Sequence, residues 1–172
     1  GYLPEERGLY KKMKVGEQAL YLARLKGMDK QDATRKLMEW FARWEMSGWG
    51  NKKVEELTKG MAQKVQFITT VLHGPQLVIL DEPFSGFDPI NAELIRTEIL
   101  RMASEGVTVM LSTHNMGSVE ELCDHIALID NSKVVLNGSV KDWRKRYSDS
   151  TYKVDFTGSK VTFANAFPYL GE

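Results

Sequence analysis

The stretch Leu77-Val78-Ile79-Leu80-Asp81-Glu82-Pro83 decides the fold of this chain. Its unbroken apolar run predicts a short strand buried on both faces, and two adjacent carboxylates follow without a spacer. The carboxyl ends of buried parallel strands form the crevice where open α/β sheets bind ligands. Asp81 and Glu82 are therefore placed to meet a metal ion and a reacting water. Taken alone, the stretch fits equally well a strand end whose acids simply face solvent.

Downstream of this stretch, strands and helices alternate. A helix is expected from Pro89, with Leu94, Ile95, Ile99 and Met102 on its buried side, followed by a buried strand over residues 107–112. A short helix over residues 115–123 and a third strand over residues 126–129 come next. This order predicts right-handed crossovers and a largely parallel sheet.

Beyond the third strand the pattern changes to a hairpin. Asn131-Ser132 is a two-residue turn, and a returning strand begins at Lys133. Residues 140–147 predict a basic helix. Alternation of Tyr152, Val154 and Phe156 with charged residues predicts a half-exposed strand in a small appended part.

Upstream, residues 14–46 predict two amphipathic helices. One apolar stripe is Val15, Ala19, Leu22 and Leu25, and the other is Leu37, Trp40, Phe41 and Trp44. Gly27 is expected to end the first helix and Asp29 to cap the second. A third helical segment is expected to start near Met61, after a glycine-rich break.

Composition excludes several classes of protein. The 172 residues carry 23 basic and 23 acidic side chains, so no whole-molecule field attracts nucleic acid or an anionic membrane. Cys123 is the single cysteine, which excludes an internal disulfide and a thiolate zinc cluster. The apolar runs are shorter than a membrane span requires, and no signal segment opens the chain.

Four stretches together resemble the ATP-binding-cassette (ABC) ATPases. They are the signature-like Leu57-Thr58-Lys59-Gly60-Met61, the Walker B-like strand ending in Asp81-Glu82, the D-loop-like Ser85-Gly86-Phe87-Asp88, and Ser112-Thr113-His114 at the switch position. They stand in the family's order and roughly its spacing. Glu5-Glu6-Arg7-Gly8-Leu9-Tyr10, near the start, is similar to the corresponding part of bacterial exporters of the sodium-efflux and drug-resistance kind. The resemblance implies a partial P-loop NTPase fold of α/β class, with a parallel core sheet, a helical subdomain and a small carboxyl-terminal appendage.

The resemblance also implies roles for individual residues. Asp81 would hold Mg²⁺, Glu82 would polarise the attacking water, and His114 would touch the γ-phosphate. Thr58, Lys59, Gly60 and Met61 would present a helix N-terminus to a nucleotide held by a second subunit. Asp88 would cross to that subunit, cap the helix that begins at Pro89, or do both.

Two motifs depart from the family pattern. Glu5 replaces the glutamine of the Q-loop, so it would approach the ion with an added negative charge. Lys59 and Met61 replace a glycine and a glutamine of the signature. A Gly-x-x-x-x-Gly-Lys-Ser/Thr phosphate loop does not occur in the 172 residues. We therefore expect a truncated chain, the carboxyl-terminal part of a nucleotide-binding subunit, inactive by itself and prone to self-association through uncovered sheet surface.

By this resemblance the chain divides into residues 1–13 (Q-loop strand and loop), 14–74 (helical subdomain), 75–138 (second half of the core) and 139–172 (appendage). The expected protein is an ATPase that uses ATP and Mg²⁺, dimerises with a second nucleotide-binding subunit, and drives a transmembrane exporter subunit from the cytoplasmic face of the membrane. No nucleic-acid partner is expected. The alternatives are a soluble ABC ATPase without a transport role and a regulatory or interaction module.

Overall fold

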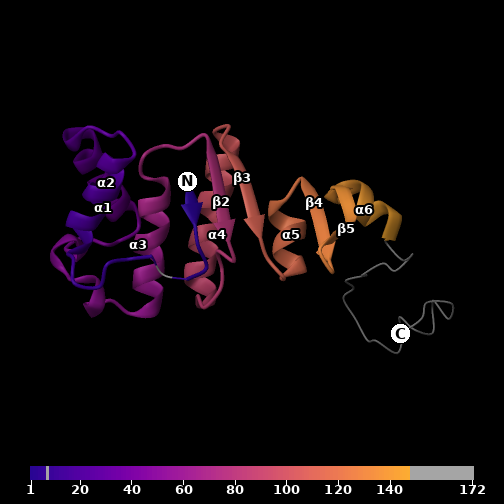
Figure 1. Cartoon of the computed structure of the whole chain (residues 1–172), viewed down its shortest axis with the longest axis horizontal. Coiled ribbons are helices and arrows are strands. Elements are labelled where there is room, and N and C mark those ends of the chain that lie inside the picture. The colour runs from indigo at the N-terminus through magenta and orange to yellow at the C-terminus, as the bar shows by residue number, and fades with distance from the viewer. Residues whose placement is uncertain (7, 148–172) are drawn as a thin grey trace, which may run out of the picture. The chain divides into compact units, whose positions relative to one another are not determined.

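The computed structural model describes residues 1–6 and 8–147 and divides the chain into two compact units, Gly1–Cys123 and Asp124–Glu172. Within the first unit, α-helices gather beside a three-stranded parallel sheet, as Figure 1 shows. The second unit contributes an antiparallel strand pair and a helix to the described residues. The predicted four-part division is finer than this and stays a prediction.

Helices form the first part of the Gly1–Cys123 unit. They are α1 (Val15–Leu25), α2 (Lys30–Arg43) and α3 (Lys59–Val71), with the short 3-10 turns η1 (Trp49–Asn51) and η2 (Val54–Glu56) between α2 and α3. The Asp29 side chain accepts from the Gln31 backbone N–H at 2.7 Å, which confirms the predicted cap of α2. Helix α3 starts at Lys59, slightly earlier than predicted, because Thr58 caps it.

The predicted apolar stripe of α1 is wrong at its last position. Val15 and Ala19 are buried, but Leu25 is 66% exposed and Ala23 takes its place in the core. The stripe of α2 is correct, since Leu37, Trp40, Phe41 and Trp44 are all buried. An aromatic cluster holds α2 against α3: the ring centroids of Trp44 and Phe67 lie 5.4 Å apart, and Trp40 meets Trp44 edge-on at 5.2 Å.

The core sheet has the strand order β1-β2-β3 and is parallel throughout. Its strands are β1 (Tyr2–Leu3), β2 (Leu77–Asp81) and β3 (Thr108–Ser112), and α4 (Pro89–Ser104) connects β2 to β3. Helix α5 (Met116–Leu122) follows β3. Leu3 pairs with Leu80, and Asp81 pairs with Ser112. The predicted parallel crossover is thus confirmed, and it brings the ends of β2 and β3 side by side.

Burial of this sheet differs from the prediction that its strands are covered on both faces. Val78 and Leu80 are fully buried with Ile95 and Ile99 of α4, whereas the alternate residues of β2 remain exposed. Strand β3 carries no fully buried residue, and Met110 is 61% exposed. The helices of the described part therefore cover one face of the sheet, and an apolar row faces out on the other.

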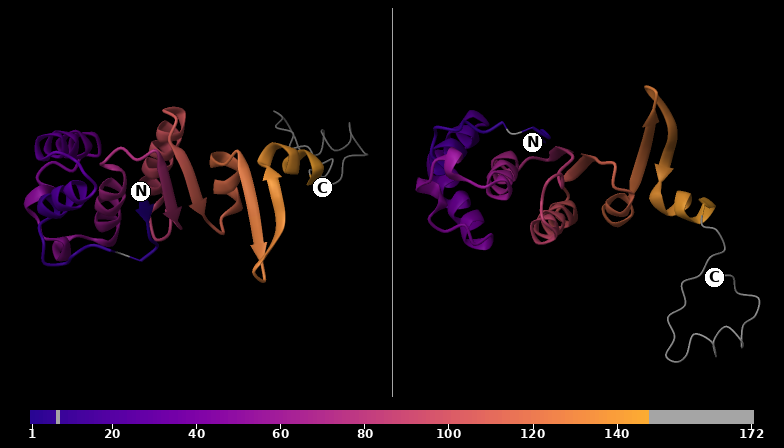
Figure 2. Two further views of the ribbon diagram at one scale, coloured as in Figure 1. Left: turned by 45° about the horizontal axis from the view of Figure 1, so that its top comes forward. Right: turned by 90° about the horizontal axis from the view of Figure 1, so that it is seen from below.

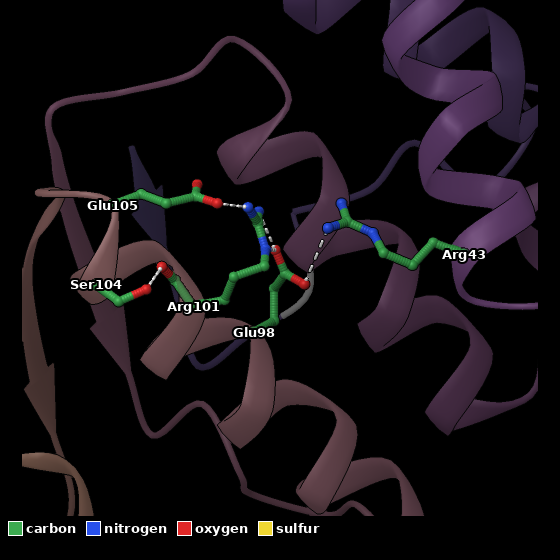
Figure 3. Close-up of polar contacts among 5 residues, drawn as sticks. All are labelled: Arg43, Glu98, Arg101, Ser104 and Glu105. Carbon is green, nitrogen blue, oxygen red and sulfur yellow. Dashed lines mark hydrogen bonds and ion pairs between the residues drawn. The ribbon is translucent and has the colours of Figure 1, made fainter.

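An ionic cluster joins α2 to α4 (Figure 3). The Glu98 carboxylate on α4 is 5% exposed and lies 3.4 Å from the Arg43 guanidinium on α2. Arg101, one turn further along α4, binds the other oxygen of Glu98 and also contacts Glu105. The Arg43 guanidinium stacks on the Trp40 ring at 4.1 Å. A buried carboxylate needs such partners, so the cluster fixes α4 against the helical part.

The unit that begins at Asp124 contains the strand pair of β4 (His125–Asp130) and β5 (Lys133–Ser139), followed by α6 (Val140–Tyr147). The predicted hairpin is confirmed, as the ribbon in Figure 2 shows. Its turn residues, Asn131 and Ser132, both have positive φ, as the tight turn requires. Residues 126–129 were predicted as a third strand of the parallel sheet, and they lie in β4, which pairs antiparallel with β5 in a two-stranded sheet. The predicted strand at Tyr152, Val154 and Phe156 lies outside the described residues.

Candidate functional site

Two carboxylates stand at the carboxyl end of β2, where the sheet places them beside the end of β3. Asp81 is the last residue of β2, and its carboxylate accepts a hydrogen bond from the Ser112 hydroxyl. The next residue, Glu82, has a φ of 43°, a left-handed conformation that is costly for a residue with a side chain. Its backbone N–H donates to the Ser112 carbonyl at 3.1 Å, which holds the strained residue in place.

The Glu82 side chain points at His114. Its Oε1 lies 2.8 Å from His114 Nδ1 and accepts from the His114 backbone N–H at 3.0 Å. The Thr113 hydroxyl donates to the second oxygen, Oε2, at 3.4 Å. The carboxylate is 19% exposed while the imidazole is 89% exposed, so one side of the pair is fixed and the other faces solvent. Residues 32 positions apart in the sequence therefore meet at the ends of β2 and β3.

A small cavity joins Glu5 to the same place. It has a volume of about 20 Å³, and Glu5, Gln63, Gln66, Asp81 and Glu82 are among the residues that line it. A cavity of this size has room for about one water molecule. The structure thus brings three of the predicted acidic residues, Glu5, Asp81 and Glu82, to one small cavity.

The residues of this cavity fit a divalent cation only in part. The described residues contain no group of three or more His, Cys, Asp or Glu side chains arranged to hold a metal ion. Mg²⁺ in nucleotide sites typically takes one or two carboxylates and completes its shell with phosphate and water oxygens. Asp81, a hard oxygen donor beside the cavity, fits that pattern as one ligand of a shell to which nucleotide and water also contribute.

The signature-like residues lie on a second surface, at the N-terminus of α3. The Thr58 hydroxyl accepts from the Met61 backbone N–H at 3.3 Å, and Thr58 and Lys59 are exposed. The Lys59 side chain lies against Gly86, where a β-carbon would meet its ammonium group. Gly60 approaches Asn91 of α4, since an added β-carbon would lie 3.6 Å from Asn91 Nδ2. The signature-like and D-loop-like stretches are therefore neighbours within one chain.

Asp88 caps α4 as the alternative interpretation predicted. Its carboxylate accepts from the Asn91 backbone N–H at 3.0 Å and also from the Asn91 side chain. These hydrogen bonds, that of the backbone first, lower the pKa of Asp88 below its ordinary value. Asp88 and Gly86 are exposed, so the cap leaves this loop open to solvent.

Sequence reasoning assigned no role to two residues that shape the cavity. Gln63, one turn into α3, donates to the Ser85 carbonyl, and Gln66 donates to the carbonyls of Pro4 and Glu6 at 3.2 Å each. Gln66 is 5% exposed, and Thr69 and Thr70, one turn further along α3, are also buried and donate their hydroxyls to its carbonyl. A glutamine at such a position is the signal that could have identified it, because a buried amide requires partners.

Comparison with known proteins identifies the same family. The ABC transporter family model matches residues 1–85. The "Uncharacterized ABC transporter ATP-binding protein YhaQ" of Bacillus subtilis is 50% identical over 147 residues, which are 86% of this chain and 49% of that protein. The "Uncharacterized ABC transporter ATP-binding protein BpOF4_11395" of Alkalihalophilus pseudofirmus is 42% identical over 96% of this chain and 62% of its own length. The chain thus spans 49% and 62% of the lengths of these two relatives.

A solved structure and a more distant relative add to this. A chain described as "Structure of ATP binding subunit of ABC transporter" superposes with a TM-score of 0.77 at 28% identity, covering 85% of this chain and 61% of that one. The "Linearmycin resistance ATP-binding protein LnrL" of Bacillus subtilis is 27% identical over 88% of this chain and 49% of its own length. The family model, the relatives and the solved structure agree with the order of the motifs and with the parallel core sheet. The chain belongs to the family of ABC transporter ATP-binding proteins.

Proposed function

We propose that this chain is the carboxyl-terminal part of an ATPase subunit that hydrolyses ATP to drive a membrane exporter. The observation that carries the proposal is the pairing of Glu82 with His114 beside Asp81. ATP hydrolysis needs one carboxylate for the ion and another for the attacking water, and these two acids stand next to each other at a strand end. The transporter names of the relatives favour this function over a non-transport ATPase or a regulatory module.

In the proposed reaction, Glu82 orients a water molecule toward the γ-phosphorus of ATP and accepts its proton. The bond from that phosphorus to the bridging oxygen breaks, giving ADP and inorganic phosphate. His114, held through its Nδ1, presents its exposed ring edge to the γ-phosphate. Mg²⁺, when bound to Asp81, would offset the negative charge of the phosphate oxygens. Glu5 lines the same cavity and would adjust the charge around that ion.

The phosphate-binding half of the site is expected to come from polypeptide that the 172 residues do not include. No phosphate loop occurs in the sequence, so nothing in it cradles the β- and γ-phosphates. The 172-residue chain is therefore proposed to be inactive by itself and active when joined to a segment that carries such a loop. The extent of the relatives beyond the matched region supports this.

A second nucleotide-binding subunit is the proposed partner at the N-terminus of α3. Thr58, Lys59, Gly60 and Met61 form the N-terminus of α3, and its positive helix end is proposed to face a nucleotide held by that subunit. Asp88, exposed in the neighbouring loop, is proposed to reach across as well. None of the helices in the described residues is long and apolar enough to cross a membrane. A separate transmembrane subunit is the proposed partner in transport, with this subunit on the cytoplasmic face of the membrane, and the transporter names of the relatives support this.

The test is Mg²⁺-dependent ATP turnover by the subunit with its phosphate-loop segment in place, compared with the Glu82→Gln variant. Loss of a general base lowers turnover by about 10²- to 10⁴-fold, whereas ATP binding should remain. Glu120→Gln is the matched control, since Glu120 is exposed on α5 and does not line the cavity. Turnover that is unchanged in Glu82→Gln would overturn the site. Activity in the 172-residue chain alone, abolished by the same substitution, would overturn the need for a phosphate loop.

A further inference from the structure

Gln66 lies in the middle of α3, and its side-chain amide grips the chain on both sides of Glu5. Its Nε2 donates to the Pro4 carbonyl at 3.2 Å and to the Glu6 carbonyl at 3.2 Å. The residue is 5% exposed, so water does not compete for these hydrogen bonds. One side chain therefore holds a carbonyl of the residue before Glu5 and a carbonyl of the residue after it, which lie 62 and 60 positions away in the sequence.

The need for this grip follows from where β1 ends. Pairing of β1 with β2 stops at Leu3, which lies opposite Leu80. Residues 4–6 continue beyond the last paired position, so their carbonyl groups have no strand partner to accept from. Gln66 supplies donors in place of the sheet. A buried amide without partners would destabilise the fold, and its placement here satisfies the amide and the loop together.

Helix α3 holds the opposite wall of the cavity through a neighbouring residue. Gln63, one turn before Gln66, donates to the carbonyl of Ser85, shortly after Glu82 in the sequence. Both glutamines line the cavity that Glu5, Asp81 and Glu82 also line. A single helix thus sets the position of the segment carrying Glu5 relative to the segment that follows the two catalytic-site acids.

We infer that Gln66 is a positioning residue that aligns Glu5 with Asp81 and Glu82, an inference that rests on the proposed function. It acts through the backbone of Pro4 and Glu6, and its own amide is already occupied by these carbonyls. The signature-like Thr58 caps α3 and Gln66 lies on the same helix, so any shift of this helix moves the Glu5 segment with it. The consequence is a direct mechanical link between the surface proposed to meet a second subunit and the cavity proposed to hold the ion.

The test compares Gln66→Met with Thr69→Val in the subunit that carries its phosphate loop. Methionine keeps the volume and removes the donors. Thr69 is a matched control, because it is buried on the same helix and donates only within α3, to the Gln66 carbonyl. We expect Gln66→Met to lower kcat about tenfold with little change in KM for ATP, since small misplacements of reacting groups have effects of this order or larger. Thr69→Val should stay within about twofold of the unmodified subunit, below the tenfold effect that misplacement gives.

A double-mutant cycle separates alignment of Glu5 from a general loss of stability. If Gln66 acts through Glu5, then Gln66→Met should lower kcat little further in a Glu5→Ala background. Full additivity of the two effects would overturn the inference. Equal effects of Gln66→Met and Thr69→Val would overturn it as well.

Cleavage of the 172-residue chain by a glutamate-specific protease tests the grip without relying on ATP hydrolysis. Gln66→Met should speed cleavage after Glu5 and Glu6 several-fold, and Thr69→Val should leave it unchanged. Unchanged cleavage in both variants would refute the grip, whatever the ATPase result. Faster cleavage together with an inactive unmodified subunit would instead refute the proposed function and leave the grip intact.

Discussion

The Glu82 carboxylate lies 2.8 Å from His114 Nδ1 and also accepts a hydrogen bond from the His114 backbone N–H, so one side chain fixes both the ring and the backbone of His114. The contact links the ends of two neighbouring parallel strands. Because the histidine ring is 89% exposed, its remaining nitrogen is open to a ligand.

Replacement of His114 by alanine should impair turnover and spare the fold. The ring makes an exposed contact, so the free energy of unfolding should change by less than about 1 kcal/mol. Loss of orientation at Glu82 should reduce kcat by at least about tenfold. Steady-state ATPase assays of the subunit with its phosphate loop, with urea unfolding of the same variant, measure both. A His114→Ala subunit with unchanged kcat would contradict this role.

The positive φ of Glu82 predicts an unusual order of stability between two variants. Glu82→Ala keeps the left-handed strain and loses the hydrogen bonds, whereas Glu82→Gly loses the same hydrogen bonds and relieves the strain. The free energy of unfolding of the Glu82→Gly variant should therefore be about 1 kcal/mol higher than that of the Glu82→Ala variant, which makes the glycine variant the more stable one. Urea denaturation of the 172-residue chain measures the difference. An alanine variant as stable as the glycine variant would show that this residue is not strained.

The cap of α3 should be sensitive to the loss of one hydroxyl. Thr58→Ala removes the acceptor for the Met61 backbone N–H and should destabilise the chain by about 1 kcal/mol. Thr58→Ser keeps the hydroxyl and should restore most of that loss. Thermal unfolding of the two variants distinguishes a capping effect from a general intolerance of substitution, which would lower the stability of both equally.

The buried Glu98 should matter more for stability than a surface carboxylate on the same helix. Glu98→Gln weakens the contacts with both Arg43 and Arg101 and should lower the free energy of unfolding by about 1–2 kcal/mol. The loss is not larger because both arginines are partly exposed to solvent. Glu93→Gln is the matched control, because Glu93 pairs with Arg96 at 2.7 Å but is 62% exposed. Its effect should stay below about 0.5 kcal/mol, and equal losses in urea unfolding would contradict the structural role of the cluster.

His73 predicts a loss of stability on acidification. Burial lowers the pKa of His73 from 6.5 to about 4, and the positive charges of Lys26, the N-terminal amino group and Lys36 add to this effect. Between these values the unfolded chain binds a proton that the folded chain does not. The contribution of His73 to the free energy of unfolding is therefore complete above about pH 6.5 and falls as the pH decreases toward about 4. His73→Asn should flatten this dependence in urea titrations across that pH range, and an unchanged slope would contradict it.

Local interactions let the sequence alone determine much of the chain. The caps at Asp29, Thr58 and Asp88 and the Asn131-Ser132 turn depend on a few consecutive residues. The strand that ends at Asp81 was equally predictable, because a short unbroken apolar run bounded by acidic residues is typical of a strand. These features were predictable because their energies come from neighbours in sequence.

Tertiary structure alone decided which distant groups meet and which faces are covered. The exposure of Leu25 and of one row of β2 depends on which surfaces have packing partners. The grip of Gln66 on residues 4–6 likewise has no local signature beyond a glutamine in the middle of α3, because its partners lie 62 and 60 positions away in the sequence. Periodicity tells which side of an element is apolar, but burial is a property of pairs of elements, and only their assembly determines it.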